Sequence, residues 1–252
     1  MIEISQLSKR YDDTVVVDDV TLTLPAGGVT AIIGPNGAGK STLLSMISRL
    51  LPMSAGRVLV DGIDVVQGDS SALARRLAIL RQDNHLPMRL TVRDLVAFGR
   101  FPHTRGRPTV ADAAHVERAL GYLGLEELAG RFLDQLSGGQ RQRAFVAMVL
   151  CQDTDYVLLD EPLNNLDMRH AVEMMRLLQR AARELGKTVI LVLHDINFAA
   201  CYADRIVAMK DGQLAYFGTP QELIVPDVLR DLYQLEIRVH EVDGQRICVY
   251  YN

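Results

Sequence analysis

The sequence lacks several features that would mark a membrane-spanning, secreted or nucleic-acid-binding chain. No apolar run approaches the ~18 residues that cross a bilayer. The start, Met1 to Ser5, has neither the basic nor the apolar segment of a signal peptide. The net charge of −4 gives no basic field for nucleic acid. The three cysteines, Cys151, Cys201 and Cys248, show no metal-ligand or redox spacing. We therefore expect reduced thiols in the cytosol, with any membrane part supplied by another chain.

What the sequence does contain is typical of a globular protein. Its 252 residues are 48% hydrophobic and 23% charged. This length allows one large domain, or one domain that carries an inserted lobe.

The most informative stretch runs from Gly34 to Ser41 and fits G-x-x-x-x-G-K-[ST], the phosphate-binding P-loop pattern. An apolar, β-branched run at 29–33 predicts a buried strand before it, and 42–47 predicts a helix after it. The glycines let backbone N–H groups converge, and the helix N-terminus adds positive charge. Lys40 is expected to reach the β/γ-phosphates, and the Ser41 hydroxyl to bind Mg²⁺. The predicted nucleotide contacts are Gly34, Pro35, Asn36, Gly37, Ala38, Gly39, Lys40, Ser41 and Thr42.

Around this loop the chain changes character twice. Residues 1–82 and 153–218 predict a strand-rich core that is antiparallel at first and becomes a parallel sheet covered on both faces. Residues 83–152 predict an inserted helical lobe, and 219–252 a small extension with two short helices and a final hairpin. Strands are predicted at 1–7, 15–24, 29–33, 57–60, 77–80, 156–160, 188–193 and 205–209. Helices are predicted at 42–47, 70–77, 91–98, 109–123, 138–151, 168–185 and 195–202.

A pair of carboxylates follows the apolar run 156–159. Since ligands of α/β sheets bind beyond the carboxyl ends of the strands, Asp160 and Glu161 are expected at the nucleotide site. Asp160 is placed to hold Mg²⁺, and Glu161 to polarise an attacking water.

A second candidate phosphate site is Leu136-Ser137-Gly138-Gly139-Gln140. A serine and two glycines at a helix start form an anion nest, in which hydroxyl, N–H groups and helix dipole point outward. From the residues alone, the alternative is that Ser137 is a helix N-cap followed by flexible glycines. Together with the site at 34–41, this suggests that one phosphate is bound from two sides.

These three motifs, in this order and spacing, resemble the ATP-binding cassette (ABC) ATPases over nearly the whole chain. The resemblance implies an α/β P-loop fold of ABC type, with a mostly parallel core sheet, an N-terminal antiparallel β part and an inserted helical subdomain. It implies one ABC ATPase domain over 1–252.

The resemblance also assigns residues that no single motif reveals. Gln82 matches the glutamine of the Q-loop and would join Ser41 and Asp160 at Mg²⁺. His194 matches the switch histidine and would act with Glu161 and Lys40 in catalysis. Asn164-Asn165-Leu166-Asp167 matches the D-loop, although Asn-Asn departs from the commoner Ser-Ala, and Asp167 would contact nucleotide. Tyr11 lies where an aromatic ring stacks on adenine. Taken alone, Gln82 could be an ordinary loop residue, His194 a helix cap, and Tyr11 a packing residue.

The mechanism that the resemblance implies requires two copies, arranged head to tail. Each ATP would lie between the P-loop of one copy and Ser137, Gly138, Gly139 and Gln140 of the other. The expected cofactors are ATP and Mg²⁺, and hydrolysis would release the dimer.

The resemblance extends to importers of iron–siderophore complexes, whose relatives carry haem or vitamin B12. Residues 98–103 and 161–168 carry this likeness. It implies a peripheral subunit on the cytoplasmic face of the membrane, with transmembrane permease subunits and, indirectly, a substrate-binding protein as partners. The basic segment 100–108 would lie near the permease, or be a solvated surface loop. An alternative is a soluble ABC ATPase of an iron–sulfur assembly scaffold. A DNA-repair or translation ATPase is disfavoured, since 83–136 is too short for a coiled-coil arm.

Overall fold

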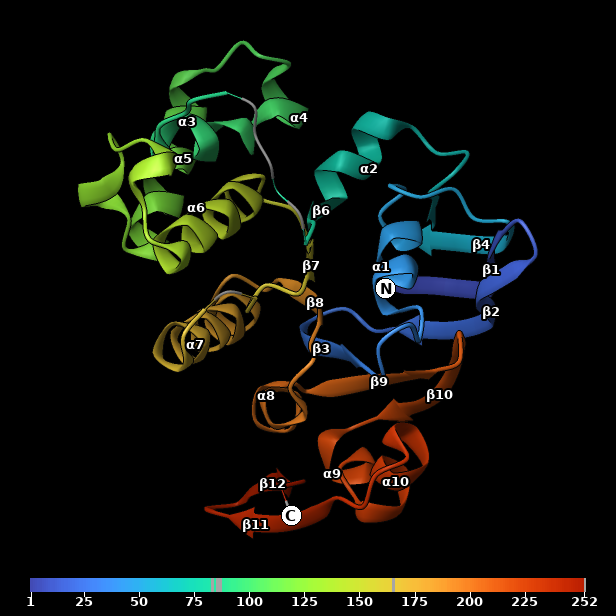
Figure 1. Ribbon diagram of the computed structural model, residues 1–252. Helices are drawn as coiled ribbons and strands as arrows, with labels where there is room; N and C mark the ends of the chain where they lie inside the picture. Colours follow the sequence, from blue (N-terminus) through green and yellow to red (C-terminus); the bar gives the residue numbers. More distant parts are fainter. Residues whose placement is uncertain (83, 85–87, 165, 252) are drawn as a thin grey trace.

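The computed structural model describes residues 1–82, 84, 88–164 and 166–251. Its centre is a six-stranded sheet in the order β10-β9-β3-β8-β7-β6 (Figure 1). Five of these strands are parallel and β10 is antiparallel to β9. The strands are β3 (Gly28–Ile33), β6 (Leu77–Leu80), β7 (Tyr156–Asp160), β8 (Thr188–Val192), β9 (Arg205–Lys210) and β10 (Gln213–Gly218).

A second, antiparallel sheet in the order β2-β1-β4-β5 encloses the P-loop helix. It consists of β1 (Ile2–Tyr11), β2 (Thr14–Leu24), β4 (Ala55–Val60) and β5 (Ile63–Asp64). Helix α1 (Lys40–Ile47) buries Leu43 and Leu44 in a core shared by this sheet and one face of the parallel sheet. Because successive strand residues face opposite sides, Ile32 joins this core while Ile33 joins the core on the other face.

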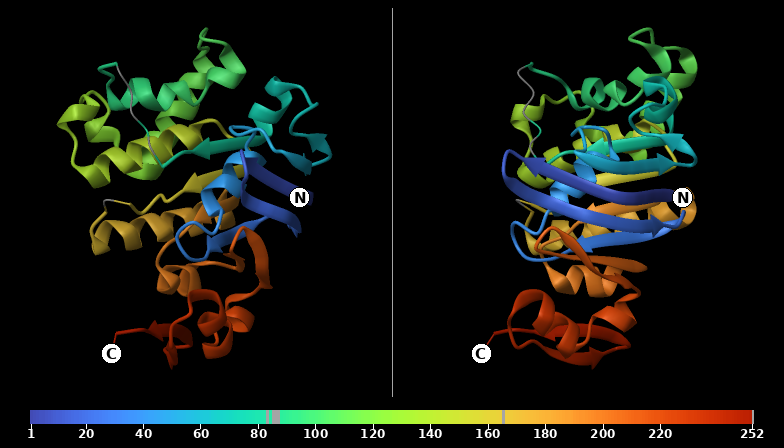
Figure 2. Two further views of the ribbon diagram at one scale, coloured as in Figure 1. Left: turned by 45° about the vertical axis from the view of Figure 1, so that its right-hand side comes forward. Right: turned by 90° about the vertical axis from the view of Figure 1, so that its right-hand side faces the viewer.

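The other face of the parallel sheet carries helices α7 (Met168–Glu184) and α8 (Ile196–Tyr202), whose apolar residues join its core. The helical subdomain lies across β6 and β7 from the antiparallel sheet, as both figures show (Figures 1 and 2). Its elements, after α2 (Ser70–Arg76), are α3 (Val92–Phe98), α4 (Phe101–Thr104), α5 (Val110–Leu123), two 3-10 turns (Glu126–Leu128 and Leu133–Gln135) and α6 (Gly138–Cys151).

Local sequence signals explain where these helices begin and end. Thr91, Thr109 and Ser137 each form a capping box with the residue three positions on, which satisfies free N–H groups of α3, α5 and α6. Gly124 ends α5 in the left-handed conformation that glycine adopts without strain.

The C-terminal extension lies at the end of the molecule opposite the helical subdomain (Figure 2). It contains α9 (Pro220–Leu223), α10 (Pro226–Tyr233) and a hairpin of β11 (Arg238–Val242) and β12 (Gln245–Val249). The expected helices and hairpin are therefore present.

The fold class is confirmed, and the differences from expectation are local. Strand β10, the short β5 and the one-turn α4 were not predicted, and β1 extends to Tyr11 instead of ending at residue 7. No helix in the described part of the chain is long and apolar enough to cross a membrane.

Candidate nucleotide-binding and hydrolysis site

The P-loop joins the end of β3 to the start of α1 through glycine conformations. Gly34 has φ 144° and Gly39, the residue before α1, has φ 91°. At Gly34 a Cβ would lie 2.1 Å from the carbonyl oxygen of Met209 on β9. The backbone therefore passes β9 at a distance that only glycine permits. This close approach fixes where the loop turns its N–H groups.

Lys40 lies inside the loop that it is predicted to serve. Its Nζ donates to the carbonyl oxygens of Gly34 (2.9 Å) and Pro35 (2.8 Å), and the side chain is buried. Burial lowers the pKa of Lys40, while the charges of Glu161 and Asp160 oppose that shift. The ammonium group thus lies at the mouth of the loop, beside two carboxylates.

The Ser41 hydroxyl donates to Asp160 Oδ1 at 2.8 Å, which joins the start of α1 to the end of β7. Burial raises the pKa of Asp160. A hydroxyl and a carboxylate are oxygen ligands of the kind that Mg²⁺ uses together with substrate phosphates, and a cation here would compensate the buried charge. In the described residues no cluster of three or more His, Cys, Asp or Glu could hold a metal by itself. This pair therefore fits a magnesium ion that binds with the nucleotide.

Glu161 is surrounded by three side chains from separate loops. His194 Nε2 lies 2.5 Å from Glu161 Oε1, Gln82 Nε2 donates to Oε2 at 2.6 Å, and the Asn164 amide donates to the same oxygen. Glu161 has φ 51°, an uncommon conformation for a side-chain-bearing residue. The structure thus brings together Glu161, His194 and Gln82, three of the predicted residues. In this structure the Gln82 amide contacts Glu161, and the predicted role of Gln82 as a Mg²⁺ ligand stays a prediction.

The contact from Asn164 was not predicted. The sequence placed Asn164 in the D-loop but gave no reason to aim its amide at Glu161. Its position three residues after Glu161, in a turn with an Asn164 N–H to Glu161 carbonyl hydrogen bond (3.2 Å), is the signal that could have suggested it. Asn165 of the same motif lies outside the described residues.

Tyr11 lies at the rim of the site. With Ser41 and Thr42 it lines a cavity of about 280 Å³ that also includes Leu50 and Arg81. Tyr11 is 47% exposed, and Lys9 Nζ lies 4.8 Å from the ring centroid. An exposed ring beside the P-loop could stack on a base, so the position agrees with the adenine role, which stays a prediction.

The second phosphate-site candidate lies at the start of α6. Ser137 Oγ accepts from the Gln140 N–H at 3.3 Å, and Gln140 Oε1 accepts from the Ser137 N–H at 3.1 Å. Ser137 and Gly138 are exposed, whereas Gly139 is buried, and a Cβ there would lie 3.1 Å from the His170 ring. Ser137 is therefore a helix N-cap, and phosphate binding by the exposed residues of this motif stays a prediction.

Within one chain this motif does not meet the P-loop. Among the described residues, no hydrogen bond or ion pair joins 137–140 to 34–42. Helix α6 belongs to the helical subdomain, whereas α1 lies between the two sheets (Figure 1). Asp167 caps α7, with Oδ1 accepting from the His170 N–H at 2.9 Å, and makes no polar contact with the P-loop in the described chain.

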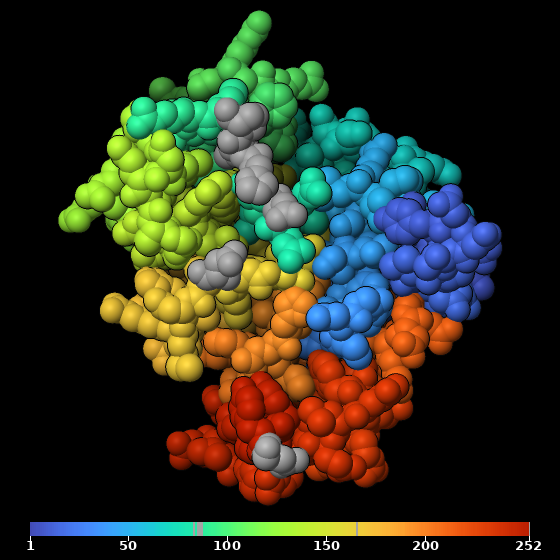
Figure 3. All heavy atoms as spheres, viewed as in Figure 1, coloured from blue at the N-terminus to red at the C-terminus, as the bar shows by residue number. Residues whose placement is uncertain are grey.

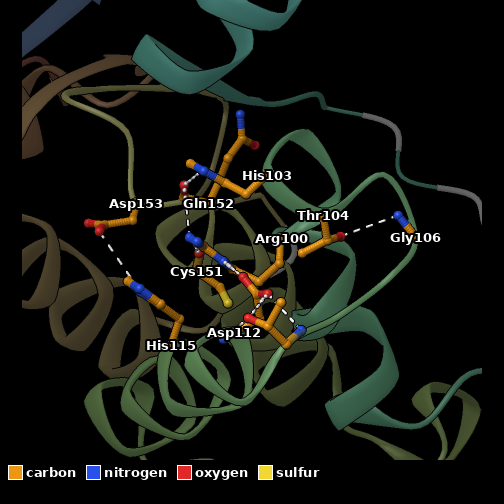
Figure 4. A network of polar contacts seen from close by, with 10 residues as sticks. Arg100, His103, Thr104, Gly106, Asp112, His115, Cys151, Gln152 and Asp153 are labelled. Carbon is orange, nitrogen blue, oxygen red and sulfur yellow. Dashed lines mark hydrogen bonds and ion pairs between the residues drawn. The ribbon is translucent and has the colours of Figure 1, made fainter.

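The basic segment 100–108 is a solvated surface loop only in part, since Arg105 and Arg107 are exposed whereas Arg100 is buried. Arg100 is 7% exposed, and its Nε donates to Asp112 Oδ1 at 3.0 Å (Figure 4). Arg100 Nη1 also donates to the Cys151 carbonyl oxygen at 2.9 Å. Residues 101–104 form α4, and Arg105 and Arg107 are exposed. Arg100 thus connects the start of α4 to α5 and α6. Its charge can be buried because a carboxylate and backbone carbonyl oxygens accept its hydrogen bonds.

The fold and this arrangement of lysine, serine and carboxylates define a P-loop nucleoside triphosphatase. The sequence also matches the family described as "ABC transporter" over residues 17–164. The chain belongs to this family, and it is an ATP-binding ATP hydrolase.

Similar proteins span the whole chain. It is 51% identical over 252 residues to "Petrobactin import ATP-binding protein YclP" of Bacillus subtilis (strain 168), covering 100% of both chains. It is 52% identical to "Petrobactin import ATP-binding protein FatE" of Bacillus anthracis, covering 99% of this chain and 100% of the other. An inward-facing "putative metal-chelate type ABC transporter" matches with a TM-score of 0.84 and 25% identity, covering 99% and 97%. A dimeric post-hydrolysis ATP-binding cassette bound to ADP and Pi matches with a TM-score of 0.77 and 30% identity, covering 87% and 99%.

Proposed function

We propose that this chain is the ATP-hydrolysing subunit of an importer that energises uptake of ferric siderophores across the cytoplasmic membrane. The relatives named above are petrobactin import ATP-binding proteins and match this chain from end to end. Their names give no support to the alternative of an iron–sulfur assembly scaffold. The subunit would act at the cytoplasmic face with transmembrane permease subunits and, indirectly, a substrate-binding protein.

The observation that carries the hydrolytic role is the environment of Glu161. His194, Gln82 and Asn164 converge on its carboxylate, one step beyond Asp160 at the end of β7. Glu161 would accept a proton from the attacking water, and His194 would hold the γ-phosphate. Asn164 and Gln82 would orient the carboxylate. Phosphoryl transfer depends mainly on such positioning and on charge neutralisation.

The remaining residues would bind and neutralise ATP. Lys40 would leave the carbonyls of Gly34 and Pro35 for the β/γ-phosphates. Ser41 and Asp160 would hold Mg²⁺, which supplies positive charge to the phosphates when bound. The exposed Ser137 and Gly138 would contact the γ-phosphate of a nucleotide on a second copy. This arrangement agrees with the dimeric state of the ADP-bound structural neighbour.

The test is ATP turnover by the full-length Glu161→Gln variant, with Glu173→Gln as the matched control. Loss of the general base should lower kcat by at least about 100-fold while ATP binding is retained. Glu173 of α7 is half-buried and pairs with Arg169, away from the described contacts of Glu161, so its variant should keep normal turnover. Near-normal turnover of Glu161→Gln would remove Glu161 from the catalytic role.

A second experiment tests the transporter assignment. Glu161→Gln should trap ATP-bound complexes, which can be captured in mild detergent and identified by mass spectrometry. Recovery of a polytopic membrane protein is expected, and its substrate-binding protein can then be screened with ferric siderophores. Recovery of soluble scaffold proteins alone would contradict the importer proposal.

A further inference from the structure

The C-terminal hairpin contacts the helix that follows His194. Asn197 of α8 donates from Nδ2 to the Cys248 carbonyl oxygen at 3.2 Å, and its Oδ1 accepts from the Cys248 N–H at 2.7 Å. Cys248 is 3% exposed and lies on β12. The side-chain amide therefore joins two segments that are 51 residues apart.

This pairing imitates a neighbouring strand. In an antiparallel pair, alternate residues point both N–H and C=O away from the partner strand. Cys248 presents both groups to Asn197 on the edge of β12 that β11 leaves free. An amide side chain has one donor and one acceptor group at the spacing of a peptide, so it satisfies both. Loss of the amide would leave two buried polar groups without partners.

Asn197 also lies three residues after His194 in the sequence. Asp195 Oδ1 accepts from the Asn197 N–H at 2.7 Å, which closes the first turn of α8. His194 immediately precedes this turn, and its Nε2 lies 2.5 Å from Glu161. Because the backbone of His194 is continuous with the first turn of α8, a shift of that turn would also move the imidazole of His194.

The extension that holds Asn197 is itself attached to the core. Lys210 at the end of β9 donates to the carbonyl oxygen and Oδ1 of Asp231 on α10, both at 2.7 Å. Arg246 of β12 donates to the carbonyl oxygens of Gln221 (2.6 Å) and Ile224 (2.9 Å) beside α9. Figure 3 shows the red atoms of the extension packed against the orange atoms of the segment that precedes it. These bonds hold the hairpin in place, so its contact with Asn197 can fix the position of α8.

We infer that Asn197 is a positioning residue, which holds the first turn of α8, and with it His194, by pairing with the β12 backbone. The C-terminal extension then contributes to hydrolysis without touching ATP. This inference rests on the roles of His194 and Glu161 in the proposed function.

The test compares Asn197→Ala with Gln179→Ala in the full chain. Gln179 Nε2 donates to the Tyr202 carbonyl oxygen at 3.0 Å, so its variant loses an amide-to-backbone bond at the far end of α8. Misplacement of a catalytic group should lower kcat of Asn197→Ala by about tenfold, with the KM for ATP changed by less than about twofold. Gln179→Ala should keep kcat. Thermal unfolding of both variants separates lost stability from lost catalysis.

A double-mutant cycle then asks whether Asn197 acts through His194. In a His194→Ala background, Asn197→Ala should lower kcat by less than about twofold, because the group it positions is gone. If Asn197→Ala does not fold, Asn197→Asp takes its place with the same expected result, because it keeps the acceptor for the Cys248 N–H and replaces the donor to the Cys248 carbonyl with a carboxylate oxygen.

Separate outcomes overturn the two claims. Equal kcat losses in Asn197→Ala and Gln179→Ala, or a full loss in the His194→Ala background, would overturn the positioning role alone. Normal turnover of Asn197→Ala beside a slow His194→Ala would do the same. Normal turnover of His194→Ala itself would remove His194 from the proposed function, and the inference about Asn197 would fall with it.

Discussion

At Gly34 the structure leaves no room for a side chain, and Gly34→Ala tests that conclusion. A Cβ would lie 2.1 Å from the Met209 carbonyl oxygen, whereas ordinary contacts of this kind are about 3.5 Å, so the loop or the end of β9 must move by more than about 1 Å. Met209 is fully buried and cannot move freely. The φ of 144° adds strain of about 1–3 kcal/mol for a residue with a side chain, and overpacking adds about 1–3 kcal/mol.

We therefore expect Gly34→Ala to lower the free energy of unfolding by about 2–5 kcal/mol. Because the loop must shift, the affinity for a fluorescent ATP analogue should fall at least about tenfold, a change of about 1.4 kcal/mol in binding. The unfolding measurement is urea denaturation followed by circular dichroism, without nucleotide, so that ligand binding does not contribute.

Gly62→Ala is the matched control for backbone strain. Gly62 has φ 79° in the two-residue turn between β4 and β5, and a Cβ there would meet no atom within 4 Å. Only the left-handed backbone penalty applies, about 1 kcal/mol. Equal losses of unfolding free energy in the two variants would show that the contact with Met209 carries no cost.

Three further predictions concern buried polar groups. Arg100→Met should lower Tm by more than about 5 °C, since it leaves Asp112 without its buried cation, whereas exposed Arg107→Met should leave Tm unchanged. Tyr122→Phe should keep or raise the free energy of unfolding by up to about 1 kcal/mol, because the buried hydroxyl has no hydrogen-bond partner among the described residues; a clear loss in urea denaturation would reveal one. Asp160→Asn should stabilise the nucleotide-free chain at pH 7. The raised native pKa of Asp160 means that the native state resists its ionisation, so this gain should disappear in denaturation curves below about pH 4, where the acid is protonated in both states; a gain independent of pH would contradict this cause.

Much of the hydrolytic site followed from local sequence. The pattern from Gly34 to Ser41 needs a strand before it and a helix after it, and both are present. Asp160 and Glu161 end an apolar run, so a buried parallel strand had to place them at the edge of the sheet where ligands bind. Such features are predictable because hydrophobic periodicity and glycine conformations act over a few residues.

The partners of the buried polar side chains were decided only by the tertiary structure. Arg100 reads as part of a basic surface segment, yet the packing of α4 against α5 and α6 buries it beside Asp112. Asn197 reads as an ordinary residue near a helix start, yet it pairs with Cys248 across 51 positions of sequence. A single sequence specifies which groups need partners, since buried polar groups must be satisfied. Which partner each group finds depends on contacts that exist only after the two sheets, the helical subdomain and the C-terminal hairpin have packed together.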